Sequence, residues 1–301
     1  MSDRPDRDVV FTYRYLRGGM VAMLLMLLLS VVLQWWWGTN GTCWLGSISA
    51  YYFTPSRTVF VGSLFALGAA LVVYKGHSPA EDVLLNFSGF MAFVVAMVPT
   101  VPDERCSTAG STNPFALSTA AISDAVNNNV WALIAVGFVA LVVTVSLRRD
   151  ELADPARRPP LRTTLLTAAC SAVIIFELVL FLALPDRFIA LSHGLAAATM
   201  VAGVIAVMVL SAFRVEDRHT STDEALTYKR WYLAIAGTLA VLLTVTVVAH
   251  LTLHGFDHVI LIGEVIIIVL FCTYWIAQTK ELWDLRDTAE VEARKVDAVA
   301  E

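Results

Sequence analysis

Eight long apolar runs alternate with short polar connectors along this chain, near residues 18–37, 58–74, 84–101, 130–147, 164–184, 190–213, 231–252 and 258–279. A helix needs about 20 apolar residues to cross the hydrocarbon core of a bilayer. Leu, Val, Ala and Ile dominate the runs, without the alternation typical of strands. Backbone polar groups inside lipid must be bonded within the segment itself, as they are in a helix. The pattern therefore predicts an all-α, polytopic membrane bundle of about eight transmembrane helices.

Composition supports this class and excludes others. Hydrophobic residues make up 57% of the chain and charged residues 16%, whereas soluble domains carry roughly 25% charged residues. The formal net charge is -5 and no basic block indicates a nucleic-acid partner. Six histidines and four cysteines are too few for a disulfide scaffold or an array of zinc ribbons. The expected partner is the lipid bilayer.

The basic residues predict an orientation. Of the 21 Lys and Arg residues, none falls in the eight runs, and all but Arg57, Arg105 and Arg187 lie in the N-terminal arm, in alternate connectors or in the C-terminal tail. Connectors rich in Lys and Arg stay in the cytoplasm. Both termini are then cytoplasmic, which requires an even number of spans. We expect a multi-pass protein of the cell membrane, in bacteria the inner membrane.

The same pattern divides the chain into three parts. Residues 1–17 are predicted to form a cytoplasmic arm, 18–279 the transmembrane bundle, and 280–301 a charged tail that continues the last helix. The Pro- and Arg-rich segment "RRDELADPARRPPLR" marks a seam near 148–163 between two four-helix halves. The first run is too long for a signal peptide, and the three tryptophans at its end are typical of an interfacial belt.

Ionisable side chains at membrane depth are costly, so they indicate function. Glu177, His193, His250 and Glu264 lie in four different runs. At about 1.5 Å per helical residue, Glu177 and Glu264 fall roughly 10 Å below the outer surface, and the histidines lie nearer the rim. The sequence thus predicts one polar layer in the outer leaflet, with no comparable set in the inner half.

The segment "SISAYYFTPSR" at residues 47–57 precedes the second run and is predicted to line an outward-facing cavity above that layer. Tyrosine offers a rigid apolar face with one hydrogen-bonding tip. Alternative interpretations are interface anchoring for the tyrosines, snorkelling for Arg57, helix–helix bridging for Glu177 and a local hydrogen bond for His193. The candidate ligand-binding residues are Ser49, Tyr51, Tyr52, Arg57, Glu177, His193, His250 and Glu264.

Two cysteines, Cys43 and Cys106, lie in outer connectors, on the oxidising side, where a disulfide can persist. A bridge would tie the first long outer connector to the second; the alternative is two separate thiols. Cys170 and Cys272 lie inside runs and are predicted to pack as small apolar residues.

A zinc site is a further hypothesis. His250, His254 and His258 are spaced four residues apart, which on one helix gives a common face. The spacing is similar to that of the intramembrane zinc hydrolases of the alkaline ceramidase and progestin-receptor-like superfamily, which use a serine, an aspartate and three histidines. Gly255 is expected to break the helix between His254 and His258, and no matching early Asp/His pair is present.

Another likeness is carried by "SISAYYFTPSRTVFVGSLFALGAALVVYKG", the following "ED", "SHGLAAATM" and "GEVIIIVLFCTYWIAQTKELW". Their order resembles a group of bacterial six-span membrane proteins distantly similar to the DRAM/Sfk type. The resemblance covers about two-thirds of the chain and implies a helical protein whose eukaryotic relatives are tied to membrane or lipid organisation, without a known enzyme activity. Glu177 falls in two extra spans outside it. The residues carried over are Ser49, Tyr51, Tyr52, Arg57, Glu81, Asp82, His193 and Glu264.

These observations predict a location and an architecture but no reaction. The leading hypothesis is an integral membrane protein whose outward cavity binds a small amphiphile or a lipid headgroup. The alternatives are a proton- or ion-coupled transporter that uses Glu177 and Glu264, and a metal-dependent hydrolase at the outer rim.

Overall fold

The computed structural model describes residues 3–100, 106, 118–147, 149, 159–216, 222–252 and 258–300, and for 3–10, 119, 250–251 and 284–300 it describes the backbone alone. Within these ranges the chain is helical and contains no strand. The helices are α1 (Asp3–Leu33), α2 (Arg57–Val73), α3 (Pro79–Met97), α4 (Thr119–Leu147), α6 (Leu161–Ala183), α7 (Pro185–Arg214), α8 (Thr222–Thr252) and α9 (Val259–Ala300). Two short elements, η1 (Gln34–Gly38) and η2 (Ser49–Phe53), lie between α1 and α2.

Seven of the described helices are long and apolar enough to cross a membrane, and the 17-residue α2 is a shorter apolar helix. The predicted fold class, a polytopic helical membrane bundle, is confirmed. Several helices extend beyond their apolar runs: α8 begins at Thr222, and α9 continues to Ala300. A helix can continue beyond the bilayer because its backbone hydrogen bonds are made within the helix. The side chains of the extension face water, and this explains why they are polar. Most of the predicted seam near 148–163 lies outside the described residues.

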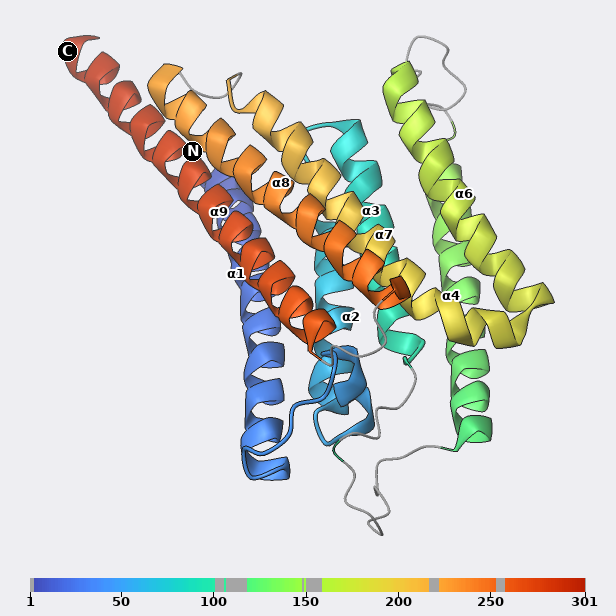
Figure 1. The fold of residues 1–301 in the computed structure, drawn as a ribbon. Coiled ribbons are helices and arrows are strands. Elements are labelled where there is room, and N and C mark those ends of the chain that lie inside the picture. Colours follow the sequence, from blue (N-terminus) through green and yellow to red (C-terminus); the bar gives the residue numbers. More distant parts are fainter. Residues whose placement is uncertain are drawn as a thin grey trace.

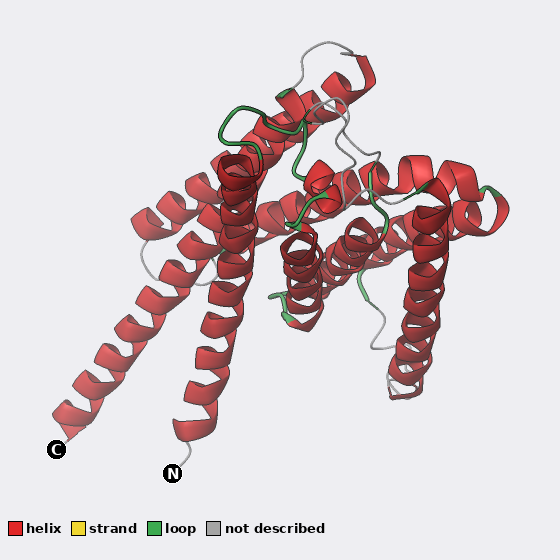
Figure 2. Cartoon of the chain, turned by 90° about the horizontal axis from the view of Figure 1, so that it is seen from below, coloured by secondary structure: helices red, strands yellow, loops and turns green. Residues whose placement is uncertain are grey.

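Both ends of the chain lie on the same side of the bundle (Figures 1 and 2). We call this side the inner end, and the side that carries η1 and η2 the outer end. In Figure 1, α1 and α9 form one edge and α4 and α6 the other, with α2, α3 and α7 between them.

The helix α3 lies at the centre of the bundle. Of its most apolar 18-residue stretch 67% is buried, against 6% of the corresponding stretch of α4. Close contacts with its neighbours depend on glycine. A Cβ on Gly89 would lie 2.6 Å from the Gly68 carbonyl oxygen of α2, and a Cβ on Gly203 of α7 would meet Ser88 of α3. Small residues let transmembrane backbones approach closely, which is where most of their packing energy arises.

The turn between α2 and α3 explains where α3 begins. Ser78 is its N-cap and accepts a hydrogen bond from the Glu81 N–H (3.3 Å), with Pro79 in the first turn. The Glu81 carboxylate in turn accepts from the His77 N–H (2.9 Å) and lies 3.7 Å from Arg214 of α7. This capping arrangement satisfies orphan N–H groups at the helix start and ties the turn to α7.

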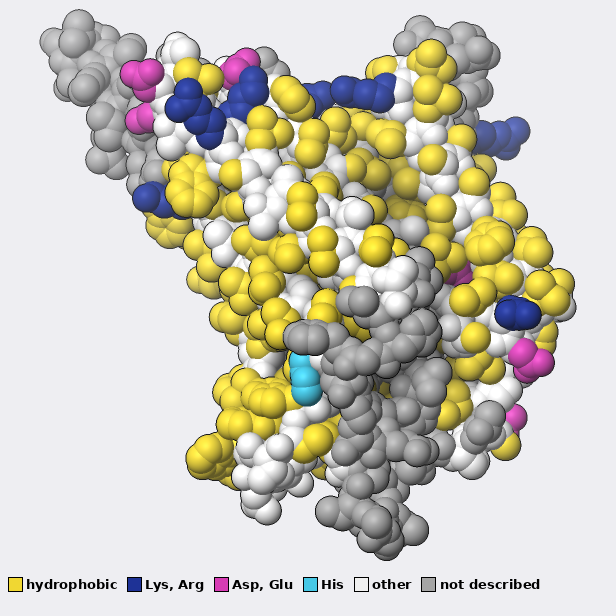
Figure 3. Space-filling view, viewed as in Figure 1, with side chains coloured by type: hydrophobic (Ala, Val, Ile, Leu, Met, Phe, Trp, Pro, Cys, Tyr) yellow, Lys and Arg dark blue, Asp and Glu magenta, His cyan; other side chains and the backbone are white. Residues whose placement is uncertain are grey.

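The face of the molecule in Figure 3 carries a broad hydrophobic band, with Lys and Arg side chains gathered at the inner end. Exposed Leu, Val, Phe and Ile side chains are numerous on α4, α6 and α8. An apolar surface of this extent suits contact with lipid chains rather than water.

Candidate functional site

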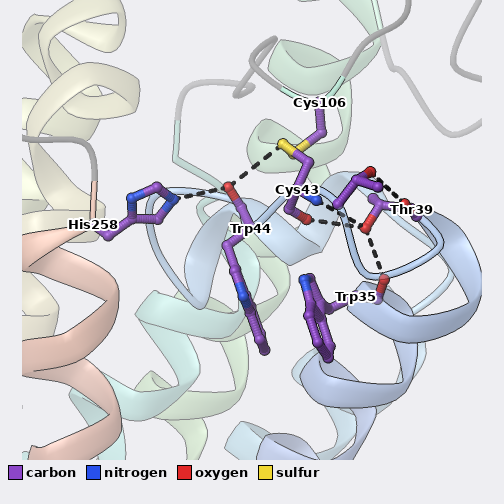
Figure 4. Close-up of a disulfide and its surroundings, with 7 residues drawn as sticks. Trp35, Thr39, Cys43, Trp44, Cys106 and His258 are labelled. Atoms are coloured by element: carbon purple, nitrogen blue, oxygen red, sulfur yellow. Dashed lines mark hydrogen bonds between the residues drawn. A yellow bond between two sulfur atoms is a disulfide. The ribbon is translucent and has the colours of Figure 1, made fainter.

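Residues 39–56, which we call the outer cap, close the outer end of the bundle. The cap begins with a sharp turn at Asn40 and Gly41, both at positive φ. Its Trp44 ring stacks on Trp35 of η1, with centroids 4.6 Å apart. The structure joins Cys43 to Cys106 by a disulfide, with Cα atoms 5.8 Å apart, which is the pairing the sequence suggested (Figure 4).

The start of α9 holds the other side of the cap. The Leu261 N–H donates to the Gly46 carbonyl (3.0 Å). His258 Nε2 lies 3.3 Å from the Trp44 carbonyl oxygen (Figure 4). The Ile48 N–H donates to Glu264 Oε2 (2.6 Å). A carboxyl group on α9 thus fixes the backbone of the cap just before η2.

Ser49 connects two of the predicted residues that lie on different spans. Its hydroxyl is 2.8 Å from His193 Nε2 on α7 and also interacts with the Glu264 carboxyl on α9. His193 Nδ1 lies 2.6 Å from the Val98 carbonyl oxygen, at the outer end of α3. Ser49 and His193 are buried. We call Glu264, Ser49 and His193 the outer relay.

The bonding of the outer relay determines where its protons can be. A carbonyl oxygen only accepts, so His193 Nδ1 carries a proton. Two arrangements then satisfy every bond with the same number of protons. In one, a neutral Glu264 donates to Ser49, and Ser49 donates to a neutral His193. In the other, a charged His193 donates to Ser49, and Ser49 donates to the Glu264 carboxylate. A proton can therefore pass from Glu264 to His193 in two coupled transfers: the acid gives its proton to the Ser49 oxygen, and Ser49 gives its own proton to His193 Nε2.

This order differs from that of a hydrolytic triad. In a triad, the histidine lies between the serine and the acid. Here the serine lies between the histidine and the acid, and the second imidazole nitrogen faces a backbone carbonyl. The arrangement is suited to holding and moving a proton, and a backbone carbonyl stands where a triad has its orienting acid.

The remaining outer candidates make separate contacts with protein groups. On α6, the buried Glu177 accepts a hydrogen bond from Ser192, the neighbour of His193 on α7. Tyr51 and Tyr52 are buried in the outer hydrophobic core. Arg57 Nε donates to the Tyr52 carbonyl (2.8 Å), and the guanidinium lies 4.7 Å from the centre of the Tyr52 ring.

The histidine triplet is only partly described. His254 and the side chain of His250 lie outside the described residues, and His258 contacts the cap. Within the described part of the chain, no group of three or more His, Cys, Asp or Glu side chains could hold a metal ion. The zinc site remains a prediction.

A polar network at the inner end was not predicted. Tyr232 of α8 donates to the fully buried Glu281 of α9. Gln278 Nε2 lies 3.2 Å from the Tyr274 hydroxyl, and the Tyr74 hydroxyl lies 3.4 Å from Gln278 Oε1. Most of these residues do not ionise near neutral pH, and Glu281 follows the last apolar run, so a search for charges inside the runs could not find them.

Between the two polar regions lie buried hydroxyl groups. Ser63 of α2 and Ser88 of α3 are completely buried, and neither hydroxyl has a hydrogen-bond partner among the described residues. Counted from the outer ends of their helices, they lie about 9 and 14 Å into the bundle.

Comparisons with protein families, curated proteins and solved structures found no match to this chain. The site must therefore be interpreted from its own geometry, and the resemblance to DRAM/Sfk-type proteins stays a prediction.

Proposed function

We propose that this multi-pass membrane protein is a proton-coupled transporter in which the outer relay is the proton-binding site. The observation that carries the proposal is the position of Ser49, whose hydroxyl lies 2.8 Å from His193 Nε2 and interacts with the Glu264 carboxyl. Ionisable groups that face the interior of a membrane bundle typically form proton relays in pumps and transporters. Because the candidate residues pack against one another, this geometry favours an exchangeable proton over a standing ligand cavity.

The relay is also bonded to the outer cap. Glu264 holds the Ile48 backbone (2.6 Å), so a change in its charge alters the bond that fixes the cap to α9. Ser63 and Ser88 offer polar positions further in, and the Tyr232–Glu281 pair lies at the inner end. These groups supply polar positions at three levels of the bundle, as a transport path requires.

A pH jump on proteoliposomes adsorbed to a solid-supported electrode tests the proposal without knowledge of the substrate. The wild type should give a transient charge movement as the relay takes up or releases a proton. Glu264→Gln keeps the acceptor for the Ile48 N–H and a donor for Ser49 but cannot ionise, so the transient should be lost. Asp124→Asn, an exposed acid on α4, is the control and should leave it unchanged. A full transient in Glu264→Gln would refute the proposal.

Infrared spectroscopy provides a second measurement on the same variants. A buried carboxylic acid gives a carbonyl band that disappears on ionisation. Titration of the wild type should remove such a band, and Glu264→Gln should lack it. Glu177→Gln identifies the contribution of the other buried acid. A titrating band that persists in Glu264→Gln and vanishes in Glu177→Gln would assign the proton to α6 instead.

A second candidate function is recognition of a lipid headgroup or small amphiphile at the outer end. It is favoured by Glu177, whose Oε1 is buried without a hydrogen-bond partner among the described residues. A ligand hydroxyl or amine could donate to this oxygen. Mass spectrometry of co-purified lipid would test it: Glu177→Gln should lower the amount of the retained amphiphile, while unchanged lipid content would reject this function.

A further inference from the structure

A cavity of about 500 Å³ lies between α1 and α9 at the inner end, far from the outer relay in the bundle. Its described lining includes three cationic side chains, Arg14, Arg17 and Lys280, and two tryptophans, Trp275 and Trp283. No acidic side chain is among these lining residues. The cavity therefore combines positive charge with an apolar aromatic wall.

Arg17 is the most informative of these residues. Its side chain is only 2% exposed, and its Nε and Nη1 have no hydrogen-bond partner among the described residues. Its guanidinium lies 5.9 Å from the centre of the Tyr74 ring. Buried guanidinium N–H groups without acceptors are costly, so a ligand that brings oxygen atoms to Nε and Nη1 would be favoured.

The other cations are held in place around the same cavity. The Arg14 guanidinium lies 3.5 Å from the Trp283 ring centre, which fixes its plane by a cation–π contact. Lys280 is exposed and can reach toward a headgroup. Guanidinium groups bind phosphate through paired, charge-assisted hydrogen bonds.

The position of the cavity along the helices indicates that the phosphate belongs to a phospholipid. Arg17 precedes the first apolar run directly, and Lys280 follows the last one. Tryptophans at this level are typical of the membrane interface, and Val21 and Ile276 extend the lining toward the hydrocarbon. A phospholipid would place its phosphate among the cations and its chains along the apolar part. Basic pockets between transmembrane helices bind anionic lipid headgroups in this way.

From these observations we infer that the cavity between α1 and α9 is a binding site for an anionic glycerophospholipid of the inner leaflet. The site is separate from the outer relay, so it can exist whether or not the protein transports protons.

Lipid titration tests the inference. Purified, delipidated protein is titrated with phosphatidylglycerol or phosphatidylcholine in mixed micelles, and thermal unfolding and native mass spectrometry report binding. Phosphatidylglycerol should bind and stabilise, and phosphatidylcholine should do so much less. Lys280→Gln should weaken binding about fivefold, and Arg17→Gln about tenfold or more. Arg230→Gln removes an exposed cation of α8 that does not line the cavity and should change nothing.

Two neighbouring glycines give a matched steric test that leaves every charge in place. Gly18 lines the cavity and Gly19 does not, and a Cβ at either position would meet no atom within 4 Å. Gly18→Leu should fill the cavity and abolish phosphatidylglycerol binding, whereas Gly19→Leu should retain it. Because the first side-chain carbon meets open space at both positions, both variants should fold.

Three results would overturn the inference. Equal binding of the two lipids would remove the role of the anionic headgroup. Equal binding by Gly18→Leu and Gly19→Leu would place the lipid elsewhere. Inorganic phosphate that stabilises the protein as strongly as phosphatidylglycerol and displaces it would assign the cavity to the free ion.

Discussion

Ser49 lies between His193 of α7 and Glu264 of α9 at the outer end. Its hydroxyl is 2.8 Å from the imidazole of His193 and interacts with the carboxyl of Glu264. A buried polar atom that loses its partner costs about 1–3 kcal/mol, more than the bond itself contributes. The hydroxyl therefore matters more for the groups it would leave unsatisfied than for its own burial.

Ser49→Ala should lower the free energy of unfolding by about 1–2 kcal/mol, because it leaves His193 Nε2 and the Glu264 carboxyl without a shared partner. Ser49→Thr keeps the hydroxyl and should lose less than half as much. Unfolding in mixed micelles, followed by tryptophan fluorescence, measures both. Equal losses in the two variants would mean that space at residue 49, and not its hydroxyl, stabilises the outer end.

At the scale of helices, the missing Cβ of Gly89 allows α3 to pack closely against α2. The Gly89 position on α3 leaves no room for a Cβ, since the Gly68 carbonyl oxygen would lie 2.6 Å away. Gly62 of α2 serves as the comparison for Gly89, because a Cβ at Gly62 would meet open space. The two glycines have the same chemistry and opposite surroundings.

Gly89→Ala should destabilise the protein by about 1–3 kcal/mol, because a backbone atom cannot move aside as a side chain can. Gly62→Ala should be neutral or stabilising by up to about 1 kcal/mol, since alanine has the better helix propensity. The same unfolding assay measures both signs. A harmless Gly89→Ala would mean that α2 and α3 can separate without loss.

The outer cap is an element whose order depends on its ties. The Cys43–Cys106 bridge closes a separation of 63 residues, for which the chain-entropy estimate is about 4 kcal/mol. The gain in this protein should be smaller, because helices persist in the unfolded state within a micelle. Cys43→Ser combined with Cys106→Ser should lower the free energy of unfolding by about 1–4 kcal/mol and expose the cap to proteolysis. Unchanged unfolding and cleavage would show that the stacked tryptophans and α9 hold the cap alone.

The elements were predictable and their contacts were not, for a physical reason. An apolar run of about 20 residues has one stable form in lipid, so its length suffices to predict a helix. The relay depends on contacts over large separations, 144 residues between Ser49 and His193 and 216 between Ile48 and Glu264. Depth along each span placed these residues at one level, but their rotation toward a common point is set by packing. The inner cavity was missed because Arg17 looks like an ordinary flanking charge.

For the whole molecule, two independent observations point to the same orientation. Both ends of the chain lie at one end of the bundle, where Lys and Arg side chains also gather on the face in Figure 3, and the positive-inside rule predicts this end to be cytoplasmic. The Cys43–Cys106 bridge lies at the opposite end, and disulfides persist on the oxidising side of a cell membrane. The orientation decides which side of the membrane the relay faces and which leaflet supplies the lipid to the cavity.

Single-cysteine labelling tests the orientation in intact cells. In a background with Cys170 and Cys272 replaced by alanine and the disulfide retained, a membrane-impermeant maleimide should label Arg187→Cys, at the outer start of α7, without permeabilisation. Arg162→Cys, at the inner start of α6, should react only after permeabilisation, because both side chains are exposed and the charge pattern predicts them on opposite faces of the bilayer. The reversed pattern would place the cap in the reducing cytoplasm and the relay on the inner side. The cavity between α1 and α9 would then face the outer leaflet, so its lipid would have to come from there.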